Sequence, residues 1–201
     1  MADPPVLTVA AWPLPERADL ADHLLHRWRE PHRSYHGVQH LAECLAAADE
    51  LAAGVEERLA LWFHDAVHTN TRGSDEAASA TLAGHLLAGV LSPPRIDAVT
   101  RLVLLTTEHR PLPDDRIGAI VCDADLWVLG AVPQRYRQSV RQVRDEFGLS
   151  DRRWTQVRRA QLLQRLSRPI YHTPQGRARE ARARANLQAE LVGLTPEDAE
   201  R

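Results

Sequence analysis

A histidine and an aspartate stand side by side, as His64-Asp65, inside a run of otherwise apolar residues. The apolar residues recur at the spacing of a helix, at Leu59, Trp62, Phe63, Ala66 and Val67. This pattern predicts a helical segment with at least one buried face. A buried imidazole beside a carboxylate is costly unless an ion or hydrogen bonds compensate both groups. The pair is therefore either an ion-paired part of the core or part of a metal site.

The same helical spacing continues along the chain, and prolines and glycines separate the periodic segments. No stretch alternates apolar and polar residues as a half-buried strand would. At 201 residues, of which 44% are hydrophobic, the chain is long enough for one substantial core. We predict an all-α, single-domain bundle over 16–192, between an irregular lead-in (1–15) and a C-terminal tail (193–201). Its helices are expected at 16–29, 34–54, 55–68, 75–91 (with Ser74 as N-cap), 95–108, 117–129, 133–147, 153–166 and 178–191.

All 25 basic residues are arginines, and between Arg135 and Arg184 they greatly outnumber the acids. Such a segment could attract an anion, but the arginines lie at helical intervals without aromatic residues among them. The pattern favours solvated helix faces over a nucleic-acid interface. Cys44 and Cys122 lack a C-x-x-C spacing, which predicts reduced thiols and a cytoplasmic protein. With no secretory signal and no apolar run of about 18 residues, we expect no membrane partner.

Two further segments offer metal ligands. His36 and His40 are four residues apart, which predicts that they share one face of a helix, with His36 in its first turn. In the segment 117–129, helical phase places Asp125 with the buried stripe and Asp123 on roughly the opposite side. An acid within an apolar stripe again requires a cation or hydrogen bonds.

Together these motifs resemble the HD superfamily of metal-dependent phosphohydrolases, which places a histidine, a His-Asp dyad and a distant aspartate on helices. The stretch Tyr35-His36-Gly37-Val38-Gln39-His40 is similar to the Tyr-His-Asn-x-x-His motif of cyclic-nucleotide phosphodiesterases. His64-Asp65-Ala66-Val67-His68 resembles their His-Asp-x-x-His motif, and Ala124-Asp125-Leu126 resembles their Ala-Asp-Leu motif. From about Trp28 to Leu191 the layout also resembles a bacterial family of predicted HD phosphohydrolases whose substrate is undefined.

The resemblance implies a helical HD domain in which the metal ligands are His40, His64, Asp65 and Asp125. Asp65 would also orient the attacking water, and His36 would take the place of the general acid. A carboxylate must then hold the proton of His36, for which Glu76 is the candidate. Candidates for a second metal ion or for substrate contacts are Asp75, Glu76, His68 and His109, and candidates for phosphate binding are Arg33 and Arg110.

The chain departs from the family pattern at two positions. It has His68 where the family usually has Tyr, and Asp75 where the family usually has Asn. In two-metal members a His-Glu pair stands where this chain has Asp75-Glu76. The missing histidine favours one tightly bound metal ion.

Two imidazoles and two carboxylates suit a divalent transition metal, and manganese, iron, cobalt, nickel and zinc are all compatible. The implied activity is hydrolysis of a small-molecule phosphate ester, such as a nucleotide or a related monoester or diester, by metal-activated water. One alternative is an HD-type di-iron oxygenase, which needs further histidine ligands, with only His109 well placed. The other is a non-catalytic nucleotide-binding or metal-binding module. A homo-oligomer stays open.

Overall fold

The computed structural model describes residues 11–194, and these residues form helices without a β-sheet, apart from one isolated bridge between Ala88 and Leu91. The predicted all-α fold is confirmed. The first part of the chain forms η2 (Pro15–Arg17), α1 (Ala18–Trp28), α2 (Val38–Glu50), α3 (Val55–Phe63), α4 (Ser74–Leu87) and α5 (Pro93–Leu105). The second part forms α6 (Arg116–Asp125), η3 (Trp127–Gly130), α7 (Pro133–Phe147), α8 (Asp151–Leu166), α9 (Pro174–Arg177) and α10 (Glu180–Gly193). Most of the expected lead-in and tail lies outside the described residues.

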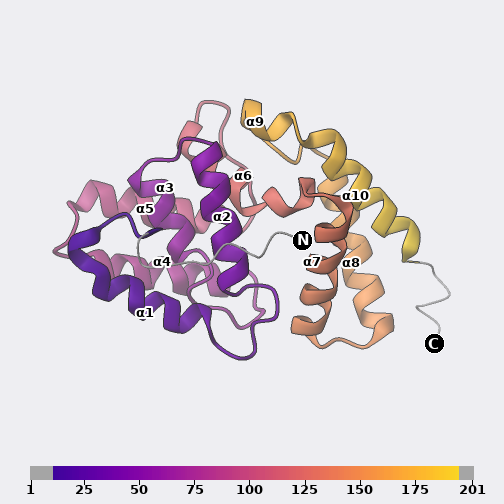
Figure 1. Cartoon of the computed structure of the whole chain (residues 1–201), viewed down its shortest axis with the longest axis horizontal. Helices are drawn as coiled ribbons and strands as arrows, with labels where there is room; N and C mark the ends of the chain where they lie inside the picture. The colour runs from indigo at the N-terminus through magenta and orange to yellow at the C-terminus, as the bar shows by residue number, and fades with distance from the viewer. Residues whose placement is uncertain (1–10, 195–201) are drawn as a thin grey trace.

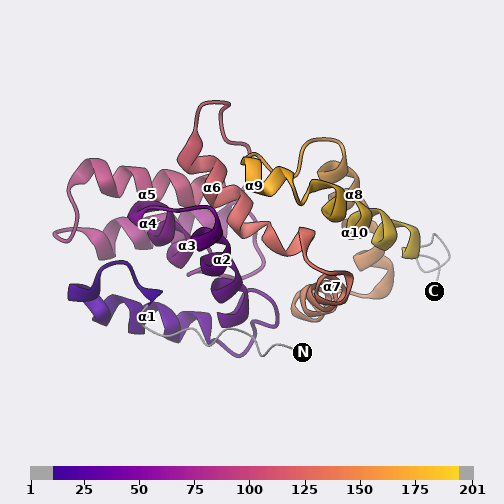
Figure 2. The same ribbon diagram turned by 45° about the horizontal axis from the view of Figure 1, so that its top comes forward.

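Helices α1 to α5 gather on one side of the molecule, and α7, α8 and α10 on the other, with α6 between them (Figures 1 and 2). The first group contains the largest buried aromatic side chains. Trp28 donates its indole N–H to the carbonyl of Trp62 at 3.0 Å, and the ring of Trp62 packs edge-on against Trp12. Leu41, Leu59 and Leu61 are fully buried beside them. This apolar core fixes α2 and α3, which carry the first histidines of interest.

The second group is held together by polar contacts to a greater extent. Arg158 of α8 makes a two-pronged contact with Glu190 of α10, at 2.6 and 3.0 Å, and Tyr136 of α7 hydrogen-bonds the same carboxylate. Helix α7 is tied to α2 by Arg135, which binds Glu43 at 2.6 and 2.8 Å. These contacts set α7 and α8 opposite the ends of α2, α3 and α6.

Several predicted helix boundaries are wrong. Helices α4, α5 and α6 end at Leu87, Leu105 and Asp125, earlier than predicted, and three further errors concern a residue of interest. Helix α2 begins at Val38 because Gly37 is extended, so His36 lies in a turn before the helix and not in its first turn. Helix α3 ends at Phe63, which places His64 and Asp65 just beyond it. The N-cap of α4 is Gly73, with a φ of 81°, and not Ser74. The ends of helices leave backbone groups without intrahelical partners. His36, His64 and Asp65 therefore lie where the backbone itself needs hydrogen-bond partners.

Within residues 11–194, no helix combines the length and the apolar character that crossing a membrane requires.

Candidate metal centre

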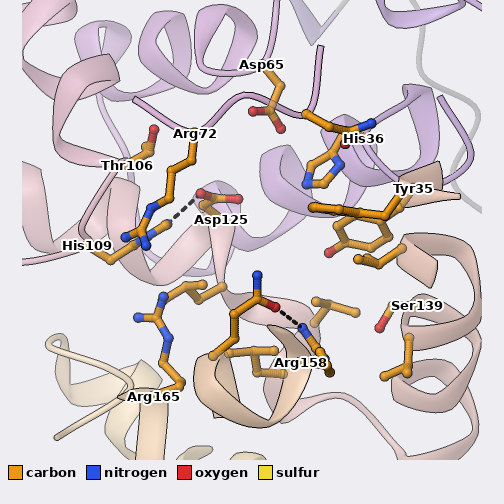
Figure 3. A pocket seen from close by; sticks show the side chains of 18 of the residues that line it. Tyr35, His36, Asp65, Arg72, Thr106, His109, Asp125, Ser139, Arg158 and Arg165 are labelled. Carbon is orange, nitrogen blue, oxygen red and sulfur yellow. Dashed lines mark hydrogen bonds and ion pairs between the residues drawn. The ribbon is translucent and has the colours of Figure 1, made fainter. Parts of the chain in front are cut away.

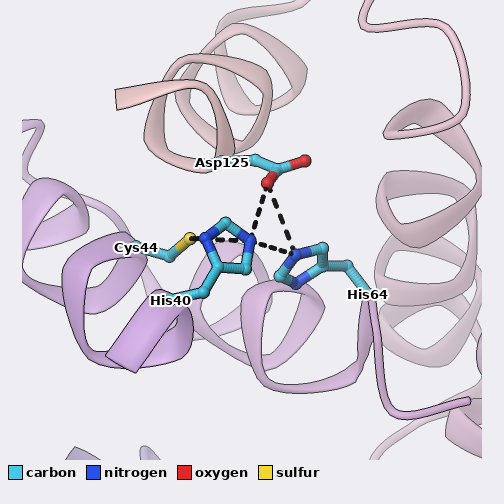
Figure 4. Close-up of side chains that lie close together, drawn as sticks. All are labelled: His40, Cys44, His64 and Asp125. Atoms are coloured by element: carbon cyan, nitrogen blue, oxygen red, sulfur yellow. Dashed lines mark hydrogen bonds and ion pairs between the residues drawn. The ribbon is translucent and has the colours of Figure 1, made fainter. Parts of the chain in front are cut away.

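Four side chains from three separate segments converge on one point between α2, α3 and α6. Nε2 of His40 lies 3.2 Å from Nε2 of His64, and Oδ1 of Asp125 lies 3.1 and 3.4 Å from these two nitrogens (Figure 4). Oδ2 of Asp65 lies 3.0 Å from Nε2 of His64 and 3.7 Å from Nε2 of His40. Atoms bound at about 2.1 Å to a tetrahedral ion lie about 3.4 Å apart. The ligand atoms of His40, His64 and Asp125 are therefore spaced as ligands of one ion would be, and Oδ2 of Asp65 lies at a similar spacing from the two histidine nitrogens.

The orientation of His64 is fixed by its other ring nitrogen. Nδ1 lies 2.8 Å from the carbonyl oxygen of Leu61, and since a carbonyl can only accept, Nδ1 must donate the proton. In a neutral imidazole this leaves a lone pair on Nε2, directed at two carboxylates and at the ring of His40. The lone pair is repelled there unless a cation lies between these groups or the ring is protonated. A backbone contact of this kind is what orients histidine ligands in metal sites.

The electrostatics of the cluster lead to the same conclusion. Burial lowers the pKa of His64, but the carboxylates of Asp65 and Asp125 outweigh burial and raise it well above its usual value. Burial likewise opposes ionisation of both carboxyls, yet His64 and its neighbours hold the pKa of Asp65 and that of Asp125 below the usual range. The cluster therefore favours one added positive charge at its centre.

Cys44 adjoins this cluster but has a different relation to it. Its Sγ lies 3.6 Å from both ring nitrogens of His40, one helical turn away (Figure 4). A sulfur at equal distance from both nitrogens lies away from the direction of the Nε2 lone pair. Burial also raises the pKa of the Cys44 thiol well above its usual value, which keeps it neutral. His40, His64 and Asp125 are thus shared by any metal site here, with Asp65 or Cys44 beside them.

A second cluster, formed by His36, His68 and Glu146, lies next to the first. The Glu146 side chain is fully buried and accepts hydrogen bonds from Nδ1 of His36, from Nε2 of His68 at 2.9 Å and from two backbone amides. The rings of His36 and His68 lie against each other at a tilt of 34°, with centroids 4.3 Å apart. Burial lowers the pKa of His36, but the carboxylates of Asp65 and Glu146 outweigh it and raise that pKa. In the metal-free protein these carboxylates therefore favour the protonated form of His36 beside the first cluster.

Both clusters open into a cavity of about 350 Å³. Asp65, Asp125, His36 and Tyr35 line its wall on the side of α2, α3 and α6, and α7 and α8 close the other side (Figure 3). Polar and apolar groups alternate on the far wall, with Ser139, Val140, Val143, Gln161, Leu162 and Arg165 contributing. Only small molecules fit a space of this size.

Two predicted acids line the cavity but have other partners. Asp75 accepts the amides of Thr69 and Thr71, at 2.7 and 2.9 Å, and the hydroxyl of Thr69 at 2.8 Å. Glu76 accepts the amide of Gly73 and so caps α4. Neither belongs to a group of converging ligand atoms among the described residues. Glu146, and not Glu76, is the carboxylate beside His36.

His109 contacts the first cluster through Asp125, on the side of that carboxylate away from His40 and His64. Its Nε2 lies 2.7 Å from Oδ2 of Asp125, the oxygen that does not face His40 and His64. Its Nδ1 is buried and has no hydrogen-bond partner among the described residues, and the residue has a φ of 51°. The histidine therefore orients Asp125, while Oδ1 of the same carboxylate faces the cluster.

The two predicted phosphate-binding arginines do not line the cavity. The side chain of Arg33 is fully buried, and its guanidinium binds Glu30 and the carbonyls of His36, Asp65 and Ala66. It fixes the two turns that carry His36 and Asp65, because those turns lie outside helices and their carbonyls need donors. Arg110 is exposed. The arginines of the cavity are instead Arg72, Arg158 and Arg165.

Asp123 is buried, whereas helical phase alone placed it away from the buried stripe. Its carboxylate accepts the amides of His172 and Thr173 and the hydroxyl of Thr173, at distances of 2.6 to 3.1 Å. At Gly176 an added Cβ would come within 2.3 Å of this carboxylate, so the position requires glycine. Asp123 therefore anchors the segment before α10, on the opposite side of α6 from Asp125.

Glu146 was missed because nothing in its local sequence distinguishes it from the other charged residues of α7. Its one weak signal is that acids are scarce between Arg135 and Arg184.

Comparison of the chain with protein-family models, with curated proteins and with solved structures found no match. The helical fold and the buried His/Cys/Asp group are compatible with an HD-type protein.

Proposed function

We propose that the protein is a metal-dependent hydrolase of a small phosphate ester, with His40, His64, Asp65 and Asp125 as the metal ligands. The observation that carries this proposal is that the two imidazole nitrogens lie 3.2 Å apart and each lies 3.0 to 3.7 Å from one oxygen of both carboxylates, at the edge of a cavity. Asp65 is preferred to Cys44 as the fourth ligand because it lines the cavity and faces Nε2 of His64. The finer resemblance to HD phosphohydrolases supports the same ligand set.

A divalent ion held there would polarise a phosphoryl oxygen and lower the pKa of a bound water. Side chains of the protein would supply the remaining chemistry. His36 would donate a proton to the leaving oxygen, and Glu146 would keep that imidazole protonated and correctly turned. His68 would limit rotation of His36, because the two rings lie against each other and His68 also binds Glu146. His109 would hold Asp125 in place through Oδ2.

A di-iron oxygenase is less well supported by the same geometry. It needs further histidine ligands for a second ion, and His109 directs Nε2 at Asp125 and not at an open position. His36, His68 and Glu146 also converge closely enough to hold an ion, but both imidazoles already hydrogen-bond the carboxylate, which suits proton transfer. A non-catalytic binding module would not need this His–Glu–His arrangement beside the ligand cluster.

The test is hydrolysis of a panel of nucleotides and sugar phosphates by the purified chain loaded with manganese. We expect phosphate release that stops on chelation and returns on adding metal, with no dioxygen consumed. Asp65→Asn should abolish turnover, and Asp114→Asn, at an exposed site away from the cavity, should not. Oxygen uptake by iron-loaded protein without phosphate release from any ester would overturn the proposal.

A further inference from the structure

One end of the cavity carries an unusual concentration of positive charge. Arg72 and Arg165 line it, on the same side as His109 and across from His36 and Tyr35 (Figure 3). Arg168 follows one turn after Arg165 and donates to the carbonyl of Glu108 at 2.8 Å. Arg72 donates to the neighbouring carbonyl of Thr107 and pairs with the Glu108 carboxylate at 2.9 Å. The guanidinium groups of Arg72 and Arg165 thus line this end of the cavity, and Arg168 lies near it without lining it.

Arg165 differs from the other arginines around the cavity because it has no partner. Arg158 is paired with Glu190 and Arg72 with Glu108. Among residues 11–194, no hydrogen bond or ion pair reaches the guanidinium of Arg165, although the residue is half-buried. Burial and the nearby charges of Arg168 and Arg72 lower its pKa to about 10. A half-buried cation next to other cations is costly unless an anion compensates it.

Arg168 adds positive charge near this end of the cavity without lining it. Within residues 11–194, its Nε and Nη1 are buried and have no hydrogen-bond partner. Buried guanidinium nitrogens are normally satisfied, so Arg168 is a poorly compensated cation close to the unpaired Arg165. An oxyanion supplies several acceptors at once, and the planar guanidinium fork matches phosphoryl geometry.

We infer that Arg165, with Arg72, forms a subsite for a second phosphoryl group of the substrate, separate from the group at the metal centre. Because two guanidinium groups line this end of the cavity and the charge of Arg168 lies nearby, a dianionic phosphoryl group fits better than a singly charged carboxylate. The inference about the substrate rests on the proposed function. It narrows the substrate class to small esters that carry phosphate at two positions.

The subsite itself is tested by titrating inorganic phosphate into the full chain and following the heat of binding. In manganese-loaded protein we expect two phosphate sites, of which one remains after the metal is removed. Arg165→Gln should weaken the metal-independent site at least tenfold. Arg152→Gln, an exposed change on the same helix, should leave it unaltered. Loss of all phosphate binding with the metal, or unchanged binding in Arg165→Gln, would overturn the subsite.

This titration does not depend on turnover, so it separates failure of the subsite from failure of the proposed function. Folding of Arg165→Gln is checked by its melting temperature, which should not fall in phosphate-free buffer because an uncompensated charge is removed. Phosphate should raise the melting temperature of the wild type but not of the variant. In turnover, Arg165→Gln should lower kcat/KM at least tenfold for esters with two phosphates and little for those with one. An equal loss on both would place Arg165 at the scissile phosphoryl group and contradict the inference.

Discussion

The two walls of the cavity differ in what holds their side chains in place. On the wall formed by α2, α3 and α6, His40 and His64 are only 2% exposed and are set among fully buried apolar residues. On the wall formed by α7 and α8, side chains are positioned by ion pairs between helices, such as Arg158 with Glu190 and Arg135 with Glu43. Tight packing fixes the first wall, whereas the second depends on charge and hydrogen bonds.

This difference suits the two walls to different tasks, metal binding for the first and contact with the substrate for the second. The ligand atoms must be held within a few tenths of an ångström, and the rigid core supplies that precision. Ser139 and Arg165 of the second wall line the cavity, and Glu146 of α7 reaches across to hold His36 of the first wall. Changes to the four ligands should therefore alter metal binding, whereas changes in the second wall, or to His36, should alter turnover.

The largest expected effect is loss of metal from the first wall. His64→Ala combined with Asp65→Ala should weaken metal affinity by more than about 100-fold, because two of the four ligand atoms are removed. Metal content after dialysis measures this, with Asp114→Asn as the exposed control. Full metal occupancy in the double variant would show that the centre lies elsewhere.

The second wall is tested by Glu146→Gln. The variant should retain its metal but lose roughly 10²–10⁴-fold in rate on esters with poor leaving groups, because His36 loses the carboxylate that holds its proton. His36→Asn should behave alike. Nitrophenyl esters, whose leaving group hardly needs a proton, should be affected much less. Asp145→Asn, at the exposed neighbouring position, is the matched control. Metal loss in Glu146→Gln would mean that the two walls are not separable.

Asp123 and Asp125 lie two residues apart on α6 and provide a sharper comparison. Asp123→Ala leaves the donors of His172 and Thr173 unpaired, so the free energy of unfolding should fall by about 3 kcal/mol while metal binding persists. Asp125→Ala should lose the metal instead. Urea unfolding together with metal analysis distinguishes them. If Asp123→Ala lost the metal and Asp125→Ala kept it, our assignment of the sides of α6 would be reversed.

The smallest effect concerns pH. Without metal, the raised pKa of His64 means that a proton occupies Nε2 below that pKa, while Asp65 and Asp125 stay ionised. A metal must displace this proton, so its affinity should fall by up to about tenfold per pH unit below that pKa and level off above it. In metal-free protein, the stability contributed by His64 is complete below its unfolded pKa of about 6.5 and is lost as pH rises through the folded pKa. Metal affinity independent of pH from 5 to 8 would contradict this account.

Local pattern predicted much of this arrangement. Helical spacing identified nearly all the helices, and phase placed Asp125 toward the buried side of its helix, where the structure sets it against His40 and His64. Phase could not identify the partner of Asp123, because the segment that covers it begins 49 residues later, at His172. Periodicity also extended α2 and α3 too far, through His36 and His64, because apolar spacing continues where the backbone turns.

The sequence by itself determined an all-α chain and brought two histidines and two acids into candidate positions, since helical spacing and the cost of burying charge are local properties. Only the tertiary structure decided what stands opposite them. Glu146 meets His36 across 110 residues of chain, and Arg33 binds Glu30 and backbone carbonyls. Arg165 has no hydrogen-bond or ion-pair partner within residues 11–194. Which charge meets which depends on how α7 and α8 pack against the ends of α2, α3 and α6. The spacing of apolar residues within a single helix carries no information about that packing.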